Sequence, residues 1–124
     1  MIDFTAFKAR SGTPIYTQIV SYIKRSIVSG AISDGDELPS RRMLSSILGV
    51  NPNTVQKSYK ILEEENLIRS KTGTKSYIIL TEDKKKQLSK EIIENDAINS
   101  IVSMKEMGLT KEQVISLIER YWGV

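Results

Sequence analysis

The side chains best suited to chemistry in this sequence are four neighbouring polar ones, Asn53, Thr54, Gln56 and Lys57. Asparagine and glutamine can pair bidentately with adenine, lysine can reach the acceptors of guanine, and the threonine methyl can contact thymine. These residues could instead form only the solvated face of an amphipathic helix. Histidine and cysteine are absent from the chain, which removes the usual general base and all thiolate chemistry. The pattern therefore favours recognition of base edges over catalysis.

Basic residues flank this polar cluster on both sides in the sequence. Arg41 and Arg42 precede it, and the arginine guanidinium suits phosphate because it can donate two parallel hydrogen bonds. A basic turn containing Gly73 follows it, and such a turn can approach a minor groove or the phosphate backbone closely. Ordinary surface charges and an exposed basic turn are the alternatives. The residues predicted to contact DNA are Arg41, Arg42, Asn53, Thr54, Gln56, Lys57, Lys60, Lys71, Gly73 and Lys75.

Two short helices joined by a tight turn are expected to position the polar cluster. The first covers about residues 40–48 and ends at Gly49, while the second begins with Asn51 as N-cap and Pro52 at its first position. The apolar positions of the first helix are Leu44, Ile47 and Leu48. The core side of the second is expected to carry Val55, Tyr59 and Leu62. This arrangement is typical of a helix-turn-helix, whose second helix enters the major groove.

The segments on either side complete a small DNA-binding domain, residues 1–80. An N-terminal arm ends at Gly12, and a helix is expected from Thr13 as N-cap to about Ser29, with isoleucines every four residues. Asn66 can end the second helix of the pair. Residues 67–69 and 76–80 are rich in β-formers and predict a hairpin, or wing. The predicted fold is mainly α with this small β-hairpin: a winged helix-turn-helix followed by a two-helix C-terminal tail.

The tail, residues 81–124, is expected to be a dimerisation segment. A helix over residues 83–107 would be roughly 36 Å long, and a Thr110–Gln113 capping box starts a last helix. The long helix cannot bury its broad apolar stripe against one short helix, so a second copy of the chain is the expected cover. The alternative is a monomer whose stripe folds back on the winged domain. The predicted interface residues are Leu88, Ile93, Ala97, Ile98, Ile101, Val102, Met104, Leu117 and Tyr121.

Composition and charge agree with a nucleic-acid module joined to an assembly module. The 124 residues carry a net charge of +3, with +4 on residues 1–80 and −1 on the rest. The sequence contains neither a transmembrane-length apolar run nor a signal-peptide pattern, so a cytoplasmic location without membrane association is expected. No cofactor or metal is expected, because Asp34, Asp36 and Glu37 lack the spacing of a calcium loop.

Three motifs, GDELPSRRML at residues 35–44, LGVNPNTVQK at 48–57 and LEEENLI at 62–68, resemble the winged helix-turn-helix of the GntR family of bacterial transcription regulators. Their order and spacing fit the family without gaps. The run over residues 51–57, together with the short tail, is similar to the YtrA-like subfamily. Two departures stand out. Arg41 occupies a position that varies in the family, and the wing sequence over residues 71–76 differs from the commoner Arg-Gly-Lys-Gly-Thr.

The resemblance implies a homodimer that binds a two-fold symmetric operator of double-stranded DNA, usually as a repressor. It implies that Arg42 contacts DNA and that Gly73 reaches the minor groove. The residues that it places in the major groove are Asn53, Thr54 and Gln56. The sequence identifies no small-molecule effector. The alternative functions are a winged-helix protein-interaction module that does not read DNA, and an enzyme, which would need paired acids that the sequence lacks.

Overall fold

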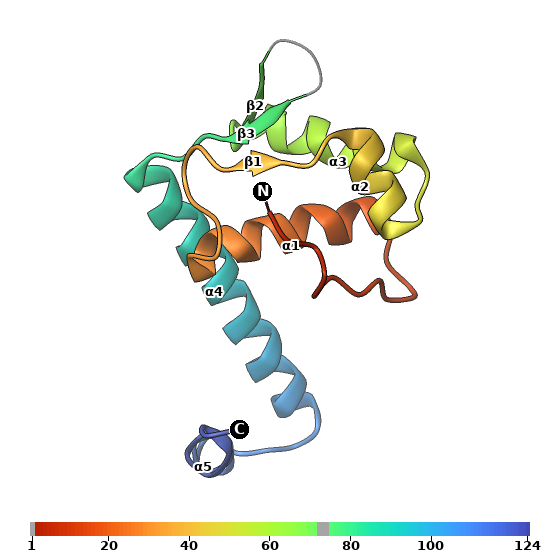
Figure 1. Cartoon of the computed structure of the whole chain (residues 1–124). Helices are drawn as coiled ribbons and strands as arrows, with labels where there is room; N and C mark the ends of the chain where they lie inside the picture. The colour runs from red at the N-terminus through yellow and green to blue at the C-terminus, as the bar shows by residue number, and fades with distance from the viewer. Residues whose placement is uncertain (1, 72–74) are drawn as a thin grey trace. The chain divides into compact units, whose positions relative to one another are not determined.

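The computed structural model describes residues 2–71 and 75–124 (Figure 1). Over these residues the chain forms five helices and three short strands. In chain order they are α1 (Ile15–Ser29), β1 (Glu37–Leu38), α2 (Arg41–Leu48), α3 (Pro52–Glu64), β2 (Ile68–Ser70), β3 (Ser76–Ile78), α4 (Glu82–Glu106) and α5 (Lys111–Tyr121). The chain divides within α4 into two compact units, Met1–Leu88 and Ser89–Val124. The predicted fold class, mainly helical with a small β-element, is confirmed.

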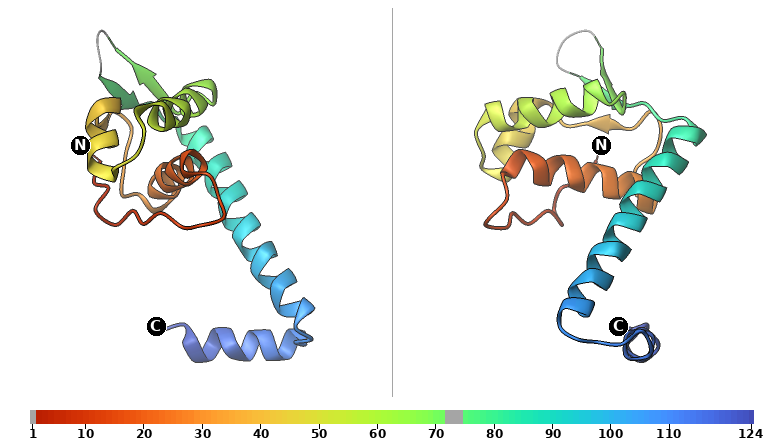
Figure 2. Two further views of the ribbon diagram at one scale, coloured as in Figure 1. Left: turned by 90° about the vertical axis from the view of Figure 1, so that its right-hand side faces the viewer. Right: turned by 180° about the vertical axis from the view of Figure 1, so that it is seen from behind.

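The first unit contains α1, α2, α3, the start of α4 and a small antiparallel sheet with strand order β1-β3-β2 (Figure 2). Helix α3 lies against both α1 and α2. The predicted hairpin is present as β2 and β3, with Ser70 opposite Ser76. Strand β1 was not predicted, because a segment of two residues has no periodicity to detect. It pairs Leu38 with Ser76, so β3 is the central strand.

Two helices begin one residue later than predicted. Ser40 accepts a hydrogen bond from the Met43 N–H and caps α2, so this helix begins at Arg41. Helix α1 begins at Ile15 with Pro14 at the N-cap position and no side-chain cap, so the predicted N-cap at Thr13 was wrong. Asn66 ends α3 as expected and has a φ of 58°, in the left-handed region that asparagine tolerates better than most residues.

The hydrophobic core of the first unit is formed by buried side chains from α1, α2 and α3. The isoleucines of α1 form its centre, with Ile19, Ile23 and Ile27 fully buried. Of the three apolar positions predicted for α2, Leu44 is fully buried, Leu48 is half-buried and Ile47 is 54% exposed.

The N-terminal arm is packed on α1. Ile2 and Phe4 are buried, and the Ile2 N–H donates to the Glu37 carbonyl of β1 at 3.1 Å. The Phe4 ring lies 5.2 Å from the Tyr22 ring, and Phe7 meets the same ring edge-on at 5.5 Å. Aromatic pairs at these separations are stabilising, so the arm is part of the folded unit.

The second unit contains the later turns of α4 and the whole of α5. Thr110 and Gln113 form the predicted capping box at the start of α5: the Gln113 N–H donates to Thr110 Oγ1, and the Thr110 N–H donates to Gln113 Oε1. From Ser89 onward the described residues include none that is fully buried, although many are apolar.

Candidate nucleic-acid interface

The buried side of α3 sets the orientation of its polar side. Val55, Tyr59 and Leu62 are fully buried, as predicted. The Asn51 side chain accepts a hydrogen bond from the Asn53 N–H at 2.8 Å, which caps the first turn. The cap and the core together define which residues of the helix face solvent.

The opposite side of α3 presents the predicted polar cluster. Asn53, Gln56, Lys57 and Lys60 are exposed, and Thr54 is half-buried. The first turn of the helix carries no acidic residue, so nothing there repels an approaching phosphate. The structure brings these five residues together on one helix, with their polar groups available to a partner.

Two buried hydroxyl groups hold α3 in place. The Tyr59 hydroxyl donates to the Pro39 carbonyl at 2.6 Å, and burial raises the pKa of this phenol above its ordinary range. Ser58 is fully buried, and its Oγ lies 3.1 Å from the Tyr16 carbonyl and 3.0 Å from the Thr54 carbonyl. The helix is therefore joined by hydrogen bonds to α1 and to the segment before α2.

Lys57 is held over the start of α1. Its ammonium nitrogen lies 3.9 Å from the centre of the Tyr16 ring, within the range of a cation–π interaction. Tyr16 is the second residue of α1. Its half-buried ring sits beside the polar side of α3, and no local pattern in the sequence could have indicated this proximity.

The two arginines of α2 have different environments. Arg42 is exposed and has no acidic partner within residues 2–71 and 75–124. The Arg41 Nη2 donates to Glu63 Oε1 at 3.0 Å, and its guanidinium carbon lies 5.3 Å from the centre of the Tyr59 ring. Arg42 is thus available to a phosphate, whereas Arg41 is engaged within the protein.

The wing supplies further positive charge. Lys71 and Lys75 are exposed, and the Lys71 N–H donates to the Lys75 carbonyl at 2.9 Å, which closes the hairpin. The Lys71 ammonium lies 5.1 Å from the centre of the Tyr77 ring. Gly73, the predicted minor-groove contact, lies outside the described residues.

The predicted dimer residues are mostly exposed in the single chain. Ile93, Ile98, Ile101 and Val102 of α4 are 46–58% exposed, and Tyr121 of α5 is 56% exposed. Ala97 and Leu117 are exposed as well, and Met104 is half-buried. Leu88 is the exception: it is 7% exposed and belongs to the first unit, so its assignment to the interface is corrected to a core position.

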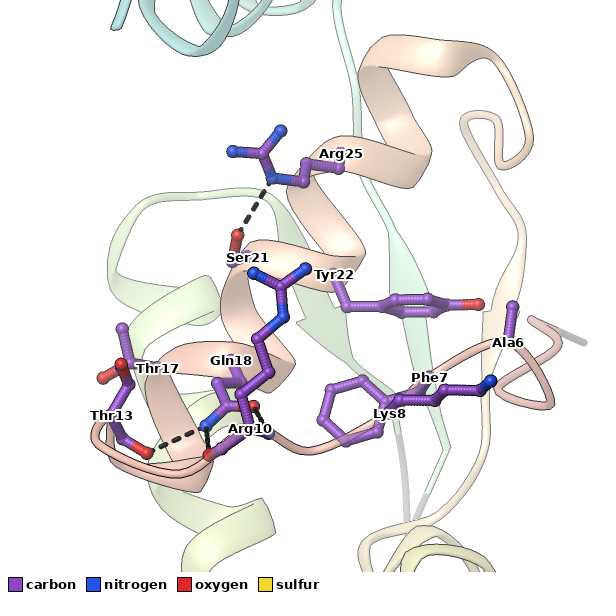
Figure 3. Close-up of a pocket in the computed structure, with 10 residues that line it drawn as sticks. All are labelled: Ala6, Phe7, Lys8, Arg10, Thr13, Thr17, Gln18, Ser21, Tyr22 and Arg25. Atoms are coloured by element: carbon purple, nitrogen blue, oxygen red, sulfur yellow. Dashed lines mark hydrogen bonds between the residues drawn. The ribbon is translucent and has the colours of Figure 1, made fainter. Parts of the chain in front are cut away.

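An open cleft of about 940 Å³ lies between the N-terminal arm and α1 (Figure 3). The Gln18 side chain lines this cleft and joins it to the arm: Oε1 accepts from the Arg10 N–H, and Nε2 donates to the carbonyls of Arg10 and Thr13. The Phe7 and Tyr22 rings form one end. None of the residues predicted to contact DNA lines this cleft, so it is separate from the candidate interface.

Two further features bear on function within the described part of the chain. Its helices are all too short or too polar to cross a lipid bilayer.

The acidic residues near β1 accept hydrogen bonds from the backbone: Asp34 accepts from the Leu80 N–H at 2.7 Å, and Asp36 accepts from the Ser33 N–H at 2.7 Å. These two carboxylates therefore stabilise a loop.

Comparison with known proteins gives a consistent result. Residues 15–78 match the family described as bacterial regulatory proteins, gntR family. The HTH-type transcriptional repressor YtrA of Bacillus subtilis (strain 168) is 48% identical over 69 residues, which cover 56% of this chain and 53% of YtrA. The chain thus aligns with only about half the length of that repressor. The HTH-type transcriptional regulator YhcF of the same organism is 32% identical over 116 residues, covering 90% of this chain and 93% of YhcF.

A solved structure agrees with these relatives over nearly the whole chain. A GntR family transcriptional regulator from Listeria monocytogenes superposes with a TM-score of 0.81 at 37% identity. The match covers 90% of this chain and 98% of the other, so it includes both compact units.

Proposed function

Because the chain belongs to the gntR family of bacterial regulatory proteins, in its YtrA-like subfamily, we propose that it represses transcription as a homodimer bound to a two-fold symmetric operator. Proteins of this family are DNA-binding regulators and not enzymes. Occupancy of an operator near a promoter blocks polymerase. In this scheme residues 1–80 bind DNA and residues 81–124 hold the dimer together.

The observation that carries the proposal is the polar side of α3. Three core residues and an N-cap hold this helix so that Asn53, Gln56 and Lys57 project from one exposed surface. The first residues of a recognition helix meet base edges in the major groove. We assign Asn53, Thr54 and Gln56 to base recognition, since their side chains can donate and accept hydrogen bonds or contact a thymine methyl.

Cations around this surface are assigned to the phosphate backbone. Arg42, Lys57 and Lys60 are exposed on α2 and α3. Lys71 and Lys75 extend the positive charge along the wing. Phosphate contacts of this kind supply affinity and register, while the bases supply specificity.

The exposed apolar residues of α4 and α5 support assembly. Ile93, Ile98, Ile101 and Val102 would each leave about half of an aliphatic side chain in water in a single chain. If these residues pack against the same residues of a second copy, the apolar surface is removed from water and the dimer has two-fold symmetry. Two recognition helices then engage two half-sites together, which raises the affinity well above that of one.

Selection of binding sites from random duplexes tests the proposal directly. We expect an enriched site that is an inverted repeat, and binding to it should weaken steeply as salt concentration rises. A single unpaired half-site would contradict the dimer. Failure to bind any duplex at low ionic strength would favour a winged-helix module that binds protein instead of DNA. A reporter gene placed behind the selected site then tests repression.

Substitution of Gln56 tests the assignment of base-reading residues. Gln56→Ala should lose roughly 1–3 kcal/mol on the selected site, because a bidentate base contact disappears, and little on random DNA. Fluorescence anisotropy with both duplexes measures the two losses. The matched control is Glu64→Ala, an exposed residue at the other end of the same helix, which should leave the ratio of the two affinities unchanged. Equal losses on both duplexes would remove Gln56 from the base-reading set.

A further inference from the structure

One carboxylate oxygen joins the recognition helix, the helix before it and the wing. Glu63 Oε1, near the end of α3, accepts from Arg41 Nη2 of α2 at 3.0 Å and from Ser70 Oγ of β2 at 2.8 Å. Ser70 Oγ lies 3.2 Å from Ser76 Oγ on β3, and the two serines are opposite each other in the sheet. A chain of polar contacts therefore runs from α2 through α3 to the central strand of the wing.

Arg41 is held in this network on more than one side. Its guanidinium lies over the Tyr59 ring, its side chain is 27% exposed, and its Nε is buried without a hydrogen-bond partner among the described residues. Leaving a buried N–H unpaired is unfavourable, and a fully solvated arginine would avoid it. The neighbouring Arg42 is exposed to solvent, whereas Arg41 is partly buried. Burial of Nε and the ion pair with Glu63 point Arg41 into the protein.

The polar contacts of Glu63 bear on how α3 and the wing are placed relative to each other. Both α3 and the wing are assigned to one DNA surface, so their relative placement decides whether base and backbone contacts form together. The wing itself is small, with three paired residues in β2 and three in β3. Glu63 contacts this hairpin through the Ser70 hydroxyl and contacts α2 through the Arg41 guanidinium.

We propose that Arg41 is a positioning residue, which acts through Glu63 and Ser70 to hold the wing in register with the recognition helix. This inference rests on the proposed function, because it takes α3 and the wing to contact the same duplex. Arg41 then contributes to discrimination between operator and random DNA, and not to phosphate neutralisation. This assignment replaces the phosphate contact expected for Arg41 from the sequence.

Glu63→Gln gives the sharpest test, because two explanations predict opposite signs. Removing a negative charge near DNA should tighten binding to every duplex if only Coulomb forces matter. The positioning role instead predicts about tenfold weaker binding to the operator, a magnitude typical of coupled contacts, with random DNA bound as well as before or slightly better. Ser70→Ala, which changes no charge, should weaken operator binding in the same direction. Tighter operator binding by Glu63→Gln would overturn the inference.

Arg41→Met and Arg42→Met form a matched pair in a salt series. A phosphate contact contributes about one unit to the slope of log K against log salt. We expect Arg42→Met to lower this slope and Arg41→Met to leave it unchanged while weakening operator binding. In the double variant Arg41→Met/Glu63→Gln, the loss should not exceed that of the larger single variant, because both break one connection. A slope that falls equally for both arginine variants would contradict the inference.

These measurements separate the inference from the proposed function. A native protein that binds no duplex would overturn both. Operator binding that depends on Arg42 and Gln56, together with Glu63→Gln and Ser70→Ala variants that bind normally, would overturn only the positioning role. Thermal unfolding of each variant establishes that it is folded at the assay temperature, and the uncharged Ser70→Ala change keeps the test decisive if an arginine variant is unstable.

Discussion

The side chains of α3 form two groups. Buried ones hold the helix in the fold, and exposed ones are available to contact DNA. Tyr59 belongs to the first group: its ring is fully buried, and its hydroxyl anchors the segment before α2 through the Pro39 carbonyl. Gln56, three residues earlier, belongs to the second group and is exposed. Three residues span about 300° of a helix, so these two side chains are only about 60° apart and lie across the boundary between the buried and the exposed side of α3. Stability and recognition therefore depend on neighbouring residues that can be changed separately.

Tyr59→Phe should reduce the free energy of unfolding by roughly 1–3 kcal/mol at neutral pH, because the buried Pro39 carbonyl loses its donor. Urea unfolding followed by circular dichroism measures this loss. The control is Tyr16→Phe, since the contact of Tyr16 with Lys57 is made by its ring, which the substitution keeps. A change below a few tenths of a kcal/mol in Tyr59→Phe would mean that the hydroxyl does not hold α3 in place.

The same residue predicts a dependence of stability on pH. Burial raises the pKa of the Tyr59 phenol in the folded protein, and the opposing effect of Arg41 is smaller. An unfolded tyrosine has a pKa of about 10, so the folded state retains the proton more strongly than the unfolded state above that pH. The stabilising contribution is complete below pH 10 and is lost as pH rises through the folded pKa. The difference in unfolding free energy between the native protein and Tyr59→Phe should therefore shrink above about pH 10.

At the scale of elements, side-chain caps decide where the helices of the DNA-binding unit begin. Ser40 and Asn51 each accept a backbone N–H in the first turn of α2 and α3. The turn between these helices is short, with Gly49 in the left-handed conformation at a φ of 66°. The Asn51 cap therefore lies directly before the exposed first turn of α3, which carries Asn53.

Asn51→Ala should lower the free energy of unfolding by about 1 kcal/mol, because the Asn53 N–H loses its acceptor. Asn51→Ser keeps a side-chain acceptor and serves as the matched control, with little loss expected. Thermal or urea unfolding measures both variants. If the alanine and serine variants were equally stable, the cap would have no role in holding α3.

At the scale of the whole molecule, the apolar surface of the second unit is the feature that a folded monomer leaves unexplained. The described residues from Ser89 onward contain none that is fully buried, although isoleucine, valine and methionine recur through α4. Trp122 is 83% exposed beyond the end of α5. A second copy of the chain is the partner that we propose for this surface.

Ile101→Glu should shift the protein from dimer to monomer, because it places a charge at the centre of the proposed interface. Sedimentation equilibrium measures the change, and operator affinity should fall with it as one half-site is lost. Asn99→Glu is the matched control, since the helical period places Asn99 on the other side of α4. A native protein that is monomeric at every concentration would contradict the proposed dimer.

Local chemistry in the sequence was enough to predict much of this protein. The cap at Asn51, the end of α3 near Asn66 and the capping box at Thr110 all depend on residues within four positions of each other. The buried side of α3 follows from its helical period, which also predicted the exposed polar cluster. The family motifs agree with these local signals, and the family match confirms the DNA-binding class.

Tertiary structure decided what depends on residues distant in the sequence. The partner of Arg41 is 22 positions away, and Lys57 contacts a ring 41 positions before it. Strand β1 exists because Leu38 meets Ser76, and Leu44 is fully buried whereas Ile47 on the same helix is exposed. Short-range hydrogen bonds and periodicity are properties of a segment, whereas the environment of a charged or apolar side chain is a property of the packed whole. For this reason the sequence determined where α3 begins and which side it buries, and only the folded molecule distinguished Arg41 from Arg42.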